Sequence, residues 1–200
     1  LDCPLVFCFG QNNREYVMDH IGQEFRQNVV LQELNCEKID AQTYNAIFLS
    51  AQFWRALASK GKILTIQTDS WISKFSDFII EDFMEFDFIG SAYSRLRPIG
   101  IIADGGNGGL SLRDWHKSVA CIKKFNPKYW RGGEDGYFNF HIDLLGGKVA
   151  DFGSCLKFGT QSIHAYNSWG FHQPSLLPLE IQREVMRKEP DLAEIATFSS

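Results

Sequence analysis

The stretch GKILTIQTDS, residues Gly61–Ser70, guides the interpretation of the fold. Lys62–Ile66 is a short run of β-favouring residues after a glycine, which predicts a buried strand. The strand ends abruptly in the polar residues Gln67-Thr68-Asp69-Ser70. Ligands in open α/β sheets lie beyond the carboxyl ends of strands, so Asp69 is a candidate for holding a divalent cation against a phosphate. The alternative is that Asp69 or Ser70 caps a following helix.

Strand and helix patterns alternate on both sides of this stretch. We expect strands at Leu5–Phe9, Asn28–Leu34, Lys62–Ile66, Asp87–Gly90, Leu110–Arg113 and Lys148–Phe152. We expect helices at Glu15–Phe25, from Asp40 or Thr43 to Leu57, over part of Phe75–Phe86, and at Asp114–Lys124, Tyr137–Leu145 and Leu176–Arg187. This alternation predicts an α/β fold in which parallel strands are joined by crossover helices.

The composition limits the class of protein and its partners. A chain of 200 residues fits one large domain, or one domain and a small appendage, and 17 Phe supply a substantial core. The net charge of −4, without any Lys/Arg block, argues against nucleic acid as a partner. No apolar run approaches a membrane span and no signal-peptide pattern opens the sequence. We therefore expect a cytoplasmic protein.

The cysteines and the start of the sequence add two further expectations. The five cysteines (Cys3, Cys8, Cys36, Cys121 and Cys155) are scattered, without close metal-type spacing. Reduced and mostly buried thiols are the expected state. The sequence opens directly with Leu1-Asp2-Cys3-Pro4, so we expect one domain of a larger multidomain protein.

Two glycine-rich turns carry candidate chemistry. Glycine lets a backbone approach a ligand closely, so the turn Asp104–Gly109 suggests the wall of a pocket, with a flexible hairpin as the alternative. In the turn Trp130–Gly136, the adjacent acids Glu134 and Asp135 are either partners of a helix dipole or a general base over a pocket.

Five short sequence segments, taken in their order along the chain, carry a family resemblance. The segments are YNAIFLSAQFW (44–54), ILTIQTDS (63–70), NGGLSLR (107–113), GGEDGYF (132–138) and GFHQP (170–174). Together they resemble nucleotide-sugar glycosyltransferases of the GT-A fold. More narrowly, they resemble a little-studied family of glycosyltransferase-like domains from bacteria and large algal viruses (chloroviruses). The resemblance covers Tyr44–Pro174.

The resemblance implies a fold and a division of the chain. The expected fold is a single GT-A domain, with a Rossmann-like, central, mostly parallel sheet flanked by helices. That domain would span residues 1–174, and residues 175–200 would form a C-terminal helix and tail that can lead into a further domain. A viral origin would place the protein in the host cytoplasm.

The resemblance also assigns a metal site. Such enzymes carry an Asp-x-Asp motif whose last acid binds the metal that bridges the donor diphosphate. Here the motif is Gln67-Thr68-Asp69, so Asp69 takes the metal role. Gln67 departs from the motif, because an amide supplies hydrogen bonds but no charge. His172 is the expected second ligand and His164 the fallback, with Mn²⁺, or alternatively Mg²⁺, as the ion.

The remaining roles concern the substrates. Gln67, Thr68, Asn107, Gly108 and Gly109 would contact the donor. The turn after the first strand, with Gly10, Gln11, Asn12 and Arg14, would lie near the nucleotide base and ribose. The second acid of the acidic turn is the base in inverting relatives. Asp135 is therefore the expected base, and Glu134 the expected acceptor-binding residue.

The expected function is a metal-dependent glycosyltransferase that moves a hexose or deoxyhexose from a UDP-sugar to a glycan hydroxyl with inversion. One alternative is a nucleotidyltransferase-like enzyme, but that would favour more basic residues near the first turn, where only Arg14 stands. The other alternative is a nucleotide-sugar-binding domain without catalysis. Gln67 motivates it, whereas Glu134 and Asp135 argue against it.

Overall fold

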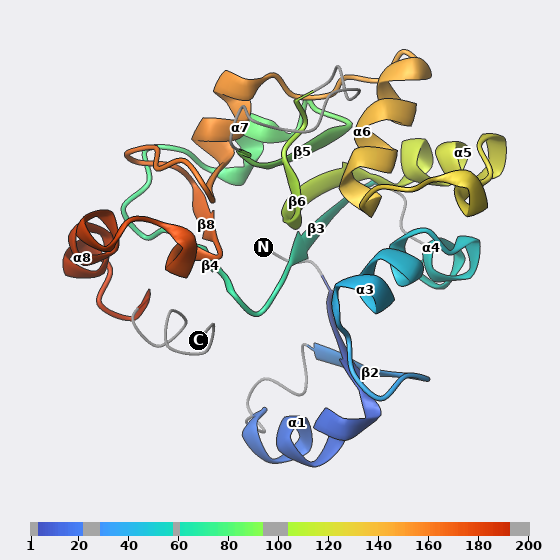
Figure 1. The fold of residues 1–200 in the computed structure, drawn as a ribbon, viewed down its shortest axis with the longest axis horizontal. Coiled ribbons are helices and arrows are strands. Elements are labelled where there is room, and N and C mark those ends of the chain that lie inside the picture. The colour runs from blue at the N-terminus through green and yellow to red at the C-terminus, as the bar shows by residue number, and fades with distance from the viewer. Residues whose placement is uncertain (1–3, 22–28, 58–60, 94–103, 193–200) are drawn as a thin grey trace. The chain divides into compact units, whose positions relative to one another are not determined.

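The computed structural model describes residues 4–21, 29–57, 61–93 and 104–192. The chain forms two compact units, Leu1–Leu49 and Ser50–Ser200, and each is described by itself (Figure 1). The candidate site residues fall in both units. The acids and histidines that carry the predicted chemistry all belong to the second unit.

The first unit contains a two-stranded parallel sheet and short helices. Strands β1 (Leu5–Gly10) and β2 (Val29–Leu34) pair in parallel, as the alternation predicts for strands joined through a helix. Between and after them lie η1 (Gln11–Asn13), α1 (Arg14–His20) and α3 (Ala41–Phe48). Asp40 caps α3, because its Oδ1 accepts a hydrogen bond of 2.9 Å from the Thr43 N–H. The predicted end of the first helix, at Phe25, lies outside the described residues.

The second unit contains two three-stranded sheets. Strands β3 (Lys62–Ile66) and β5 (Phe88–Ser91) both pair antiparallel with β6 (Asn107–Asp114), in the order β3-β6-β5. The other sheet has the order β4-β8-β7 and is mixed. In it, β4 (Ser70–Ile72) is antiparallel to β8 (Gly170–His172), which is parallel to β7 (Gly159–Thr160).

The predicted fold class, a Rossmann-like GT-A domain with a central mostly parallel sheet, is wrong. The described residues form three small sheets, and the sheet that contains the key strand β3 is antiparallel. Parallel neighbours need a crossover connection, usually a helix. After β3 the chain instead forms β4, turns and the 3₁₀ helix η2 (Ile80–Phe83), and β6 then lies between β3 and β5 in the opposite direction.

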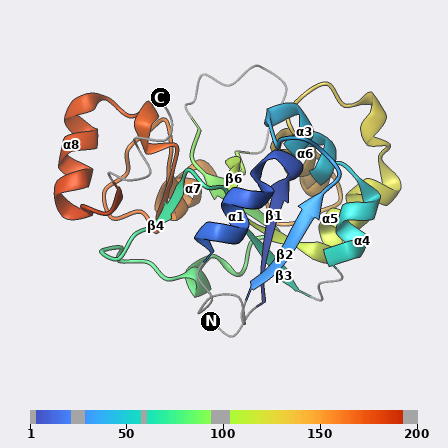
Figure 2. The same ribbon diagram turned by 90° about the horizontal axis from the view of Figure 1, so that it is seen from below.

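Helices cover both sides of the antiparallel sheet. Figure 1 shows α5 (Trp115–Lys124) and α6 (Glu134–Leu144) on one side and α7 (Phe152–Phe158) on the other. Between the sheet and α7 lies a core of Phe83, Phe86, Ile89, Ala92, Leu110, Leu112, Ala150, Cys155, Phe158 and Trp169. The remaining helical segments of this unit are α4 (Ala51–Leu57), η3 (Pro127–Tyr129), η4 (Pro174–Leu176) and α8 (Leu179–Lys188). Figure 2 shows α8 and α5 at opposite ends of the unit.

Three local predictions differ from the structure because capping and turns interrupt the expected elements. The predicted helix to Leu57 is split into α3 and α4, and the Ser50 Oγ accepts a hydrogen bond from the Gln52 N–H where α4 begins. The acidic aromatic stretch before β5 forms only η2. The predicted strand at residues 148–152 is reduced to one bridge from Val149 to Phe88, because Asp151 caps α7.

Candidate functional site

The turn after β3 is fastened to two other strands. It is closed by a hydrogen bond of 2.9 Å from the Ser70 N–H to the Gln67 carbonyl. The Gln67 N–H donates to the Gly109 carbonyl of β6 at 2.8 Å, and the Gln173 N–H, just after β8, donates to the Asp69 carbonyl at 2.9 Å. The predicted motif Gln67-Thr68-Asp69 is therefore held where β6 and β8 meet it.

Three side chains converge at this turn, and we call Gln67, Asp69 and His172 the donor group. The His172 Nε2 lies 2.9 Å from the Gln67 Oε1 and 3.4 Å from the Asp69 Oδ1. His172 is only 2% exposed, whereas the Asp69 side chain is 27% exposed. Burial raises the pKa of Asp69, but the hydrogen bond and charge of His172 more than offset this and leave the pKa below its ordinary value.

The donor group fits a divalent cation in its chemistry. Beyond the long contact with the His172 Nε2 at 3.4 Å, the buried Oδ1 of Asp69 has no hydrogen-bond partner among the described residues. A buried carboxylate oxygen with so little compensation is costly unless something binds there. Cis ligands of an octahedral ion with bonds of about 2.1 Å are about 3 Å apart, close to the separations observed around the His172 Nε2.

Two further observations define how such an ion would be held. A Cβ at Gly109 would lie 2.2 Å from the His172 Nε2 and 2.5 Å from the Gln67 Oε1, so only glycine keeps this space open. No three Asp, Glu, His or Cys side chains of the described residues form a metal-binding group. The amide oxygen of Gln67 would be the third protein ligand of the ion. This set suits an ion that takes its other ligands from substrate phosphates.

Asp135 is connected to the donor group through β6. The Tyr93 hydroxyl contacts the Asp135 Oδ2, and the Asn107 Nδ2 donates to the Tyr93 oxygen at 2.7 Å. The Asn107 Oδ1 in turn accepts from the Gly109 N–H at 2.6 Å. The Asp135 Oδ1 accepts from the Gly136 N–H at 2.6 Å, at the start of α6. A half-buried carboxylate and the donor group thus share one hydrogen-bonded framework.

Glu134 lies in a different environment from its neighbour. Its carboxylate is buried and binds both terminal nitrogens of Arg113, one of them at 2.9 Å. Arg113 is fully buried and lies between the Phe88 and Phe138 rings, with its Nε donating to the Ser111 Oγ at 3.0 Å. Burial raises the pKa of Glu134, and the guanidinium opposes that rise. This ion pair anchors the first residue of α6 to β6 and so positions Asp135.

The structure brings most of the predicted residues of the second unit together. Gln67, Asp69, His172, Asn107 and Gly109 form the donor group and its framework, which reaches Asp135. Gly108 faces Glu134 instead, since a Cβ there would lie 1.8 Å from the Glu134 Oε1. Thr68 is exposed in the turn.

The fallback histidine has other neighbours. His164 lies in a hollow that is also lined by Phe75, Tyr166, Glu184 and Lys188, with its ring 4.6 Å from the Tyr166 ring. Burial lowers the pKa of His164. His172, rather than His164, is therefore the histidine placed beside Asp69.

The predicted residues of the first unit have local structural roles. A Cβ at Gly10 would lie 2.7 Å from the Glu37 carbonyl oxygen, so the glycine allows two backbones to approach. The backbone N–H groups of Gln11 and Asn12 donate to Cys36 and Glu37, and Arg14 pairs with Glu33 at 2.5 Å. Their predicted contact with the nucleotide stays a prediction.

Sequence reasoning missed Tyr93 and Arg113. Tyr93 follows β5 in a stretch without any periodic pattern, so nothing in the sequence singles it out. Arg113 had a usable signal, because a charged residue at the end of the predicted strand Leu110–Arg113 needs a partner if the strand is buried. The four described cysteines are free, and Cys121 and Cys155 are buried. Among the described helices, none has the length and apolarity to cross a membrane.

Comparison with known proteins identifies the family. Residues 28–174 match the family described as a protein of unknown function, DUF5672, and the chain belongs to that family. The match includes the donor group, β6 and Asp135. No curated protein and no solved structure matches the chain.

Proposed function

We propose that this DUF5672 protein is a divalent-metal-dependent glycosyltransferase that uses a nucleoside-diphosphate sugar, with a UDP-sugar as the expected donor and a glycan hydroxyl as the acceptor. One observation supports the proposal above the others. The donor group of Gln67, Asp69 and His172 and the carboxylate of Asp135 are joined by hydrogen bonds through Gly109, Asn107 and Tyr93. Transfer from a diphosphate ester to a hydroxyl requires a cation site and a carboxylate base in one framework.

Gln67, Asp69 and His172 would hold Mn²⁺ or Mg²⁺ together with the diphosphate of the nucleotide sugar. Asp69 supplies the charge, His172 a nitrogen ligand and Gln67 an amide oxygen. The bound ion would stabilise negative charge on the phosphate oxygens. Because the donor group contains one carboxylate, Asp69, we expect the ion and the diphosphate to bind much better together than separately.

Asp135 is the proposed general base. The hydroxyl oxygen of the acceptor forms a bond to the anomeric carbon and passes its proton to the Asp135 carboxylate. The bond from that carbon to the phosphate oxygen breaks, and its electron pair leaves with the nucleoside diphosphate. A single displacement of this kind inverts the anomeric configuration. Glu134 is paired with Arg113 in the interior, whereas Asp135 is only half-buried, so Asp135 is the acid of this pair that we assign as the base.

Calorimetry with UDP and MnCl₂ tests the proposal. For the wild-type protein, we expect Mn²⁺ to tighten UDP binding by about five- to 150-fold, the usual range for coupling between two ligands. In Asp69→Asn, which keeps the size of the side chain, this gain should be lost. The matched control is Asp143→Asn, at an exposed position of α6, and it should bind as the wild type does.

Two results would contradict the proposal. One is UDP binding that Mn²⁺ does not change in the wild-type protein. The other is an Asp69→Asn variant that retains the full gain. If His164→Ala removes the gain in UDP affinity and His172→Ala does not, His164 rather than His172 is the metal ligand.

A further inference from the structure

The hydrogen bonds between the donor group and Asp135 have a fixed direction. The Gly109 N–H can only donate, so the atom of Asn107 that contacts it must be the amide oxygen. The Asn107 nitrogen therefore faces Tyr93 and donates to the hydroxyl oxygen. The Tyr93 proton is then left to point at the Asp135 Oδ2. Each of these three hydrogen bonds is therefore donated in the direction that leads from Gly109 to the Asp135 carboxylate.

We propose that Tyr93 is a positioning residue that couples the donor group to Asp135. Its hydroxyl is the link between Asn107 and the carboxylate, and it holds the Asp135 Oδ2 while the Gly136 N–H holds the Oδ1 at 2.6 Å. This inference rests on the proposed function, since it concerns the same site. It assigns a role to a residue outside the donor group and outside the acidic turn.

Gly109, the first residue of this series of hydrogen bonds, lies against the side chains of Gln67 and His172. Gly109 has no side chain, and a Cβ there would overlap the His172 Nε2 and the Gln67 Oε1 at 2.2 and 2.5 Å. The Gly109 carbonyl also accepts from the Gln67 N–H at 2.8 Å. A ligand that moves Gln67 or His172 therefore presses directly on the Gly109 backbone. The shift reaches Asn107 through the Gly109 N–H, and Tyr93 passes it to Asp135.

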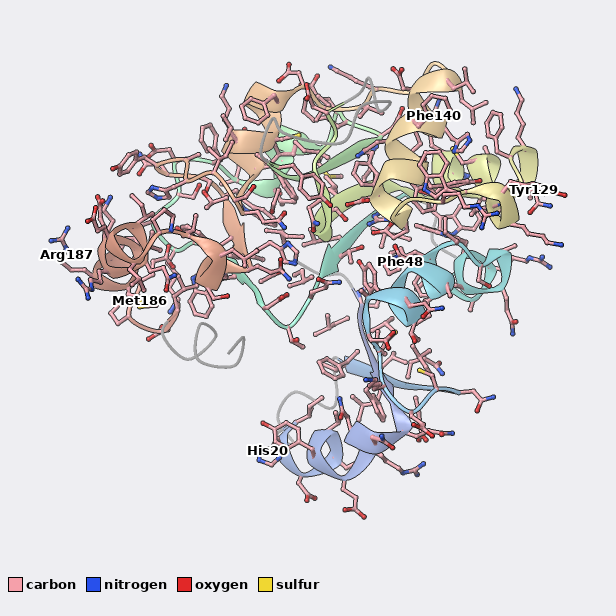
Figure 3. All side chains as sticks on the ribbon, in the orientation of Figure 1. His20, Phe48, Tyr129, Phe140, Met186 and Arg187 are labelled. Atoms are coloured by element: carbon pink, nitrogen blue, oxygen red, sulfur yellow. The ribbon has the colours of Figure 1, made fainter. Side chains whose placement is uncertain are left out.

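Amide NMR can follow both ends of this series without measuring turnover. The probe is Mg²⁺ added to the ¹⁵N-labelled protein in the presence of UDP, and the reporters are the amides of Gly109 and Gly136. In the wild type, we expect Mg²⁺ to shift both signals. In Tyr93→Phe, which removes only the hydroxyl, the Gly109 signal should still shift and the response of Gly136 should be lost. The matched control is Tyr129→Phe, because Tyr129 is 75% exposed and lies at the surface (Figure 3).

The outcomes separate the coupling from the proposed function. A Gly136 response in Tyr93→Phe equal to that of the wild type overturns the coupling. A wild-type protein in which only Gly109 shifts overturns it as well, and leaves the metal site standing. If neither amide of the wild type responds to Mg²⁺, the proposed function and the coupling both fail.

Discussion

Gly108 and Gly109 are neighbours in β6, yet they face two polar groups of opposite character. Adjacent strand residues point to opposite sides. Gly108 faces the ion pair of Arg113 and Glu134, whereas Gly109 faces the donor group of Gln67, Asp69 and His172. The ion pair is closed, since its carboxylate meets a guanidinium and both side chains are at most 3% exposed. The donor group is open, because the Asp69 side chain is 27% exposed and, among the described residues, its Oδ1 has no hydrogen-bond partner beyond the 3.4 Å contact with the His172 Nε2.

The difference separates stability from function in one short stretch of chain. A buried charge that already has its partner can hold two elements together, but it has little left to offer a ligand. A group of unsatisfied donors and acceptors costs stability, and that cost suggests a role in binding. The three predictions below test this contrast, first on the ion pair, then on Asp135 and finally on the two glycines.

Breaking the ion pair should have the largest effect on stability. Glu134→Ala leaves Arg113 buried and unpaired, which typically costs about 3–5 kcal/mol of unfolding free energy. Urea denaturation of the variant and the wild type measures the loss. The control is Glu85→Ala, at an exposed pair with Lys148, where we expect less than about 1 kcal/mol.

A replacement of both partners sharpens this test. Arg113→Met combined with Glu134→Leu removes the charges together, so the double variant should recover much of the lost stability. A Glu134→Ala variant that unfolds like the wild type would show that the pair contributes no net stability. Glu134 would then return as a candidate for binding the acceptor.

Asp135→Asn should leave folding and metal binding intact and remove the base. The amide keeps the size of the side chain but lacks the basic oxygen. Loss of a well-placed general base costs about 10²–10⁴-fold in rate. The measurement is single-turnover transfer from UDP-sugars to glycan acceptors, with Mn²⁺-dependent UDP binding as the control. A fully active variant would transfer the role of base to another acid.

The sequence predicts local elements of this chain better than their pairing. The positions of strand β3 and of the helix that begins at Asp114 were predicted correctly, because both depend on nearby residues, although β3 is only partly buried. The antiparallel insertion of β6 between β3 and β5 depends on contacts far apart in the chain, and alternation alone suggested parallel strands.

The candidate site shows the same division. Asp69 could be selected from the sequence, because it follows a predicted strand within a polar turn. His172 was selected only through the family resemblance, and the structure places the two side chains 3.4 Å apart. The different environments of Glu134 and Asp135 could not be predicted. Their separation depends on Arg113, which lies 21 positions before Glu134 and reaches it only across the fold. Tyr93 likewise gains its role from the position of Asn107.

The two glycines of β6 offer the most direct test of the contrast, with the smallest expected effects. A methyl group at Gly108 would overlap the Glu134 Oε1 at 1.8 Å and the Arg113 Nη2 at 2.7 Å. Gly108→Ala should therefore strain the ion pair and lower stability by about 1–3 kcal/mol, as overpacking of a buried site does. Mn²⁺-dependent UDP binding should change little in this variant.

Gly109→Ala places the same methyl group on the other side of the strand, against the His172 Nε2 and the Gln67 Oε1. Gln67 is half-buried and can turn away, whereas the atoms met at Gly108 belong to a fully buried ion pair, so the cost in stability should be smaller than at Gly108. The donor group would then lose its arrangement, and the Mn²⁺-dependent gain in UDP affinity should fall by about tenfold or more, the range for disturbed metal surroundings. Calorimetry and urea denaturation of the two variants side by side measure both quantities. If Gly108→Ala and Gly109→Ala lose the same stability and neither changes UDP binding, the two sides of β6 do not differ in the way proposed here. A loss of binding confined to Gly109→Ala would mark its side as the one that receives the ligand.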